Sequence, residues 1–98
     1  MPELHDLEVA LDLACHTSYT PKTRQGRNLV LAMPREWVLA NIAAAAEKTL
    51  DLTDDWDYAR FLELLKLFDE GLLQQFVSSG LSSNNVAVRE IAEDYRKE

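Results

Sequence analysis

Residues 54–98 read DDWDYARFLELLKLFDEGLLQQFVSSGLSSNNVAVREIAEDYRKE. Apolar side chains recur through this stretch at intervals of three and four residues, which is the spacing of one face of an α-helix. Two short polar breaks, at 69–71 and 82–85, interrupt the pattern, and an Asp or Asn in each can cap the helix that follows. The stretch is therefore predicted to form three short helices with tight connections, over 55–68, from Asp69 to near Leu81, and over 86–97.

The chain before this stretch contains two further helical patterns. Residues 34–50 begin with Pro34, which suits the first turn of a helix because its missing N–H would have no partner there. Apolar residues and alanines surround this helix almost completely, which predicts burial on two sides. Residues 4–16, LHDLEVALDLACH, carry one apolar helical face and predict an N-terminal helix.

Residues 17–34, TSYTPKTRQGRNLVLAMP, separate these two helices. They contain two prolines, a glycine and several turn-forming polar side chains, so they break the helical pattern. We predict an irregular connector here, with 28–32 as an extended run against an apolar groove. Eighteen residues is long for a structureless link, which indicates either a functional loop or an additional element.

The segment from Leu81 to Ala92, LSSNNVAVREIA, resembles the HEAT repeat, in which a polar turn leads into Val-Arg and then a small residue one turn later. The preceding helix pair, FLELLKLFDEGLLQQFVSSGL, is similar to the body of such a repeat, and the resemblance covers residues 54–98. It implies a scaffold that binds other macromolecules on a helix face without catalysis. It also implies that Arg89 has a structural role.

The predicted fold is all-α, a small helical bundle of about five helices in a single domain over 1–98. An N-terminal helix (1–16) and an irregular connector (17–34) precede a four-helix core (35–98), which consists of a HEAT-like hairpin and further helices. The 98 residues are 47% hydrophobic and 28% charged, which is typical of a globular protein that buries one modest core.

The net charge of -7 narrows the classes of partner. A chain this acidic is repelled by DNA, RNA and anionic lipid, so neither nucleic acid nor membrane is an expected partner. No apolar run is long enough to cross a bilayer and the acidic start is unlike a signal peptide, so we expect a cytoplasmic protein. One segment is basic, and its Lys22, Arg24 and Arg27 either lie across acidic helices of the chain itself or contact a phosphate or an acidic partner.

The sequence carries no recognisable catalytic motif. It has no Gly-rich phosphate loop, nucleophile elbow or zinc-ligand spacing, so we expect no enzymatic activity and no cofactor. The polar stripe of the first helix could hold a divalent metal, or it is a solvated face, which we favour. Its members are His5, Glu8, Asp12 and His16. Cys15 lies on the apolar side of the same helix and is expected to be buried.

Large apolar residues outside the predicted core faces are the candidate contact surface. They are Trp37, Trp56 and Leu67, with the acidic Asp54, Asp55 and Asp57 beside them in the sequence. The main hypothesis is a module that binds another protein through this apolar and acidic helix face. The alternatives are that the tryptophans pack in the core, that the chain is an acidic inhibitor of a nucleic-acid enzyme with a basic cleft, or that it is a homo-oligomeric subunit. The three aspartates are also well placed to cap a helix, which we consider their main role.

Overall fold

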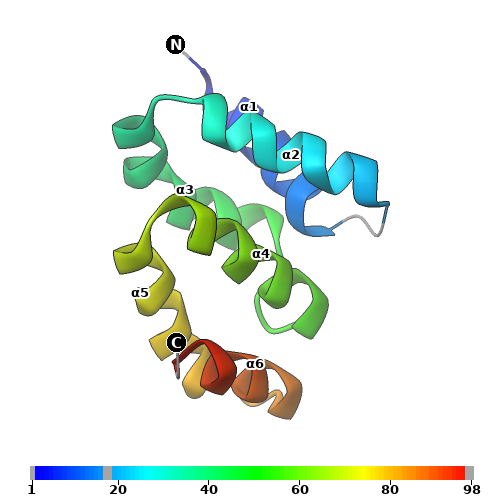
Figure 1. Cartoon of the computed structure of the whole chain (residues 1–98), viewed down its shortest axis with the longest axis vertical. Helices are drawn as coiled ribbons and strands as arrows, with labels where there is room; N and C mark the ends of the chain where they lie inside the picture. Colours follow the sequence, from blue (N-terminus) through cyan, green and yellow to red (C-terminus); the bar gives the residue numbers. More distant parts are fainter. Residues whose placement is uncertain (1, 17–18, 97–98) are drawn as a thin grey trace. The chain divides into compact units, whose positions relative to one another are not determined.

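The computed structural model describes residues 2–16 and 19–96. Within these residues all regular structure is helical, which confirms the predicted all-α class. The described part of the chain forms six α-helices, and a short π-helix continues the first of them (Figure 1). They are α1 (Leu4–Leu11), the π-helix η1 (Asp12–His16), α2 (Thr20–Ala32), α3 (Arg35–Thr49), α4 (Asp55–Phe68), α5 (Glu70–Leu81) and α6 (Val86–Arg96). None of these helices is long and apolar enough to cross a membrane.

Contacts between helices divide the chain into two compact units. The N-terminal unit is Met1–Asp51 and the C-terminal unit is Leu52–Glu98. The four helices expected after residue 34 are present as α3 to α6. Of these, α3 packs against α1 in the N-terminal unit, whereas α4, α5 and α6 pack on one another in the C-terminal unit.

In the N-terminal unit, α2 lies directly on the backbone of the first helix. A Cβ added to Gly26 of α2 would stand 2.6 Å from the Ala10 carbonyl oxygen and 2.9 Å from the Ala14 Cα, and it would also overlap the Ala14 amide nitrogen. These atoms flank the point where α1 gives way to the π-helix η1. Glycine is therefore required at position 26 for the two helices to approach this closely.

The prediction of an irregular connector over 17–34 is wrong, because α2 occupies most of that segment (residues 17 and 18 lie outside the described residues). Pro21, one of the two prolines on which that prediction rests, stands in the first turn of α2, where a proline is tolerated. The run 28–32 is helical rather than extended. The buried face of α2 consists of Thr23, Gly26 and Val30, so this face lacks the large apolar residues that reveal a helix in sequence.

In the C-terminal unit the helix ends lie close to their predicted positions. The Asp54 carboxylate accepts a hydrogen bond from the Asp57 amide at 3.1 Å and caps α4. Asp69 caps α5 in the same way, through the Leu72 amide at 2.9 Å. The rings of Phe61 and Phe76 pack edge to face with their centroids 4.9 Å apart, and this contact joins α4 to α5.

The start of α6 is fixed by Asn85. Its side-chain oxygen accepts from the Ala87 amide at 2.9 Å, and its side-chain nitrogen donates to the Thr53 carbonyl oxygen at 2.8 Å. One asparagine thus caps α6 and ties it to the segment before α4. Arg89 donates to the Ser83 carbonyl oxygen at 2.7 Å, so its side chain secures the turn that leads into α6.

Candidate functional site

A stripe of four side chains on α4 is the candidate surface. Trp56, Arg60, Glu63 and Leu67 follow one another at steps of four, three and four residues, and these steps keep them on one face of the helix. Trp56 is 42% exposed and Leu67 is 60% exposed. The opposite face of α4 is buried in the core, so the helix carries two apolar faces. We call the four residues the α4 stripe.

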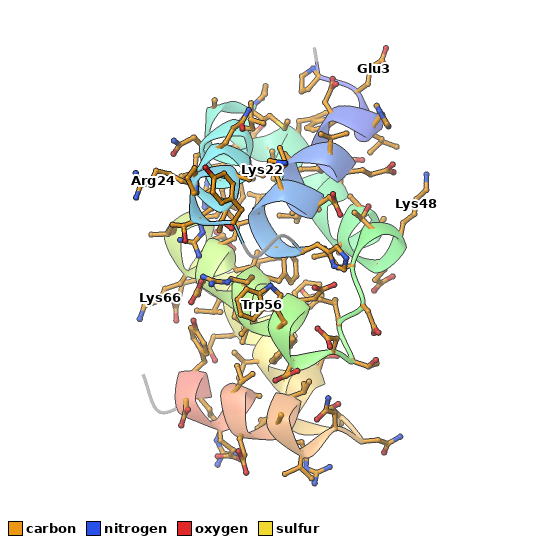
Figure 2. The ribbon with its side chains drawn as sticks, turned by 90° about the vertical axis from the view of Figure 1, so that its right-hand side faces the viewer. Glu3, Lys22, Arg24, Lys48, Trp56 and Lys66 are labelled. Carbon is orange, nitrogen blue, oxygen red and sulfur yellow. The ribbon has the colours of Figure 1, made fainter. Side chains whose placement is uncertain are left out.

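Contacts along the α4 stripe hold its centre in place. The Arg60 guanidinium carbon lies 4.6 Å from the centroid of the Trp56 ring, in cation–π contact. The same guanidinium forms an ion pair with the Glu63 carboxylate at 3.1 Å. Arg60 of the same helix therefore holds the Trp56 side chain in place, although a large part of that side chain is exposed to solvent. Figure 2 shows the position of Trp56 on α4. The middle of the stripe carries one positive and one negative charge, and its two ends are apolar.

Of the three aspartates expected beside Trp56, only Asp55 is exposed to solvent. Asp54 is half-buried, and its carboxylate caps α4. Asp57 is 2% exposed, so its carboxylate is buried. Capping thus accounts for Asp54, in agreement with the role we favoured from sequence, and the acidic character of the surface rests mainly on Asp55.

Trp37 belongs to the N-terminal unit and is not part of the α4 stripe. It lies on α3, half-buried. Its carbonyl oxygen accepts a hydrogen bond from the Asn41 side chain at 2.7 Å. The site is therefore built from the C-terminal unit alone.

The basic residues predicted to form one contact lie on different sides of a helix. Lys22 and Arg24 are exposed on α2 (Figure 2), but two residues along an α-helix are rotated by about 200°. Arg27 is half-buried. The helical conformation of this segment thus separates Lys22 from the two arginines, so the three side chains do not make a single basic patch.

The histidine and carboxylate side chains of the first helix do not gather into a group of metal ligands within the described residues. Glu8 forms an ion pair with Lys48 of α3 at 3.1 Å. Asp12 and His16 lie at the two ends of the π-helix η1. Across residues 2–16 and 19–96, no three His, Cys, Asp or Glu side chains gather where a metal ion could bind. Cys15 is buried, as expected.

A cavity of about 630 Å³ in the C-terminal unit was not anticipated from sequence. Its walls include Thr53, Tyr58, Gly80, Ser83, Asn85 and Val88. The Tyr58 hydroxyl donates to the Phe76 carbonyl oxygen at 2.8 Å, and burial raises the pKa of this phenol to about 12. A phenol with so high a pKa stays protonated at neutral pH, so Tyr58 is a structural donor and not a base. The missing side chain of Gly80 is no signal for this cavity, because Tyr58 occupies the space that a Cβ at position 80 would need.

No family model, curated protein or solved structure matches this chain.

Proposed function

We propose that the chain is a non-catalytic protein-binding module whose contact surface is the α4 stripe. The observation that carries this proposal is the exposure of Trp56 and Leu67 on one face of one helix. Large apolar groups of this kind supply much of the binding energy at protein interfaces, and tryptophan is among the residues most enriched at energetic hot spots.

The contacts within the α4 stripe support the proposal. Arg60 stacks on Trp56 and is itself paired with Glu63, so the ring is held by its neighbours before any partner arrives. Less conformational entropy is lost on binding when a side chain is already ordered. Arginine is also enriched at interfaces, where its guanidinium can stack and pair at the same time.

The second hypothesis, an acidic inhibitor of a basic cleft, has less support from this geometry. It relied on the aspartates at the start of α4, of which Asp54 caps the helix and Asp57 is buried. The net charge of -7 alone favours attraction to any basic partner but does not define a contact surface.

The test is affinity capture of proteins from a lysate of the source organism. We would compare the wild type with a Trp56→Ala/Leu67→Ala variant and with a Leu31→Ala/Val86→Ala control. The control removes two apolar side chains of similar exposure, 44% and 56%, from α2 and α6. Circular dichroism verifies that all three proteins keep the same helix content.

We expect the wild type and the control to retain the same protein, and the α4 variant to retain at least about tenfold less of it, because each hot-spot truncation costs more than about 1 kcal/mol. The captured protein is then purified and its affinity for all three chains is measured directly. Equal binding by the α4 variant and the control would contradict the proposal.

A further inference from the structure

The α4 stripe has an internal symmetry that bears on the identity of its partner. Its apolar members, Trp56 and Leu67, are centred on the point midway between residues 61 and 62. Its charged members, Arg60 and Glu63, are centred on the same point. A second α4 placed antiparallel across a two-fold axis at this point would therefore set each member of the stripe opposite its complement.

We propose, on the basis of the function proposed above, that the α4 stripe binds a second copy of this chain, with the two α4 helices antiparallel. Trp56 of each copy then packs on Leu67 of the other, at both ends of the contact. Arg60 of each copy faces Glu63 of the other, so four charges of alternating sign occupy the centre. A contact in which the same patch serves both copies is the usual form of a two-fold dimer interface.

Charge complementarity selects this orientation. In a parallel arrangement Arg60 would face Arg60 and Glu63 would face Glu63, and like charges opposed at an interface are unfavourable. In the antiparallel arrangement each guanidinium keeps the carboxylate of its own helix, 3.1 Å away, and gains a second carboxylate from the other copy. Trp56 and Leu67 are eleven residues apart, or about 16 Å along the helix, which leaves room for the charged centre between the apolar ends.

The contact is small, and this limits its strength. One helix face buries less than the roughly 800 Å² per partner of a standard interface, so the dimer belongs to the weak and transient class. Each copy also carries a net charge of -7, which opposes association at low ionic strength. We therefore expect a dimer that forms reversibly as the protein concentration rises.

Charge reversal tests both the partner and the orientation. The mass of the purified full chain is followed by sedimentation equilibrium from about 10 µM to about 1 mM at roughly 0.15 M salt, the range and ionic strength suited to a weak dimer. Arg60→Glu gives a chain with only negative charge at the centre of the stripe, and Glu63→Arg gives one with only positive charge. We expect each variant alone to dimerise at least about tenfold more weakly than the wild type.

Mixing the two variants restores opposite charges at both central positions. The carboxylate introduced at position 60 of one copy then faces the guanidinium introduced at position 63 of the other. The Arg60→Glu and Glu63→Arg chains, each weak alone, are therefore expected to form a mixed dimer with an affinity within about threefold of the wild type. The double variant Arg60→Glu/Glu63→Arg exchanges the two charges within one chain, and it should recover a homodimer for the same reason.

The affinity of the mixed dimer relative to the wild type reports the orientation of the helices. In a parallel dimer the wild type would oppose like charges at both positions, and only the mixture would oppose unlike ones. The mixed dimer would then be at least about tenfold tighter than the wild-type dimer, whereas the antiparallel arrangement predicts similar affinities.

A matched control lies on α6. Glu93 and Arg96 form an ion pair with the same spacing of three residues, at 2.6 Å, but they are outside the α4 stripe. Arg96→Glu is therefore expected to leave dimerisation unchanged. Circular dichroism shows whether each variant is folded. The double variant Arg60→Glu/Glu63→Arg has the same composition as the wild type, so its recovery of the dimer would show that the single variants lose the contact and not the fold.

Three results would overturn the proposal: a wild-type mass that stays monomeric up to about 1 mM, charge-reversed chains that do not recover when mixed, or a mixed dimer far tighter than the wild type. The capture experiment is read independently of all three. If the wild type is monomeric while the Trp56→Ala/Leu67→Ala chain loses a captured protein, the partner is a different protein and the proposed function stands. If the wild type dimerises and neither that variant nor charge reversal weakens the dimer, the α4 stripe is not the self-association surface.

Discussion

Tyr58 of α4 occupies the space that a side chain on Gly80 of α5 would need. A Cβ at position 80 would stand 2.5 Å from the Tyr58 Cζ, overlap its hydroxyl, and lie 3.1 Å from the Ala92 Cβ. The ring cannot easily move aside, because its hydroxyl donates to the Phe76 carbonyl oxygen at 2.8 Å. A missing side chain on one helix thus lets a buried phenol of another helix reach the backbone, and this contact joins α5 to the helix that carries the α4 stripe.

The first prediction concerns the two glycines of α5. Gly80→Ala should lower the free energy of unfolding by about 1–3 kcal/mol, because overpacking forces Tyr58 out of its position. Gly71→Ala is the control, since its Cβ would meet only the Asp69 carboxylate, at an ordinary 3.4 Å. We expect that control to be neutral or stabilising by up to about 1 kcal/mol, because alanine favours the helix. Urea denaturation measures both, and equal effects at the two positions would contradict the packing described.

The second prediction concerns alkaline pH. Burial raises the pKa of Tyr58 to about 12, above its ordinary value near 10 in an unfolded chain. The neutral phenol therefore contributes stability that is fully present below about pH 10 and is lost as the pH rises towards about 12. The loss is at most about 3 kcal/mol for a shift of about two pKa units.

The comparison that isolates this effect is with Tyr58→Phe, which lacks the titrating group. This variant should be about 1 kcal/mol less stable at neutral pH, through the lost hydrogen bond. Its unfolding free energy should also fall less than that of the wild type between about pH 10 and pH 12. The same pH dependence in both proteins would show that Tyr58 is not the group responsible.

The third prediction concerns the contact between α2 and the first helix. Gly26→Ala should destabilise the protein more than Gly80→Ala does, because the new methyl group meets backbone atoms of Ala10 and Ala14, which cannot rotate away. We expect a loss of about 3 kcal/mol or more. Chemical denaturation checks the order of the two variants, and a milder effect at position 26 would contradict the close approach of α2.

The fourth prediction concerns the cap of α6. Asn85→Ala removes the acceptor for the Ala87 amide and the donor to the Thr53 carbonyl, so it should cost about 1–2 kcal/mol. Asn84→Ala is the neighbouring control, an exposed asparagine whose replacement should change stability by less than about 0.5 kcal/mol. Thermal or urea unfolding measures the stability of both variants. Equal stability of the Asn85→Ala and Asn84→Ala chains would contradict the role of Asn85 as the cap of α6.

The success of the sequence predictions varies along the chain for physical reasons. In α4 and α5, large apolar residues repeat at helical spacing and Asp54 and Asp69 cap the starts, so local signals alone locate both helices. In α2 the buried face is Thr23, Gly26 and Val30, and its packing depends on a close backbone contact with the first helix. That contact is a tertiary feature with no local sequence signature.

The candidate surface was predictable only in part. Trp56 and Leu67 could be recognised because they fall among the polar positions of an amphipathic helix, and the structure shows both exposed. The stacking of Arg60 on Trp56 depends on side-chain conformation, which spacing alone does not determine. The contact of Tyr58 with Gly80 joins residues twenty-two positions apart, so it appears only once α4 and α5 are packed together.

The central claim is that Trp56 becomes covered when the module binds another chain. It is tested most directly by acrylamide quenching of a Trp37→Phe chain, in which Trp56 is the sole tryptophan. Quenching is measured in the free monomer and again once sedimentation shows the bound state, whether the second chain is a copy or a captured protein. We predict a marked fall in quenching and a blue shift of the emission, because the 42% exposed side chain leaves water. Unchanged quenching on binding would contradict the account.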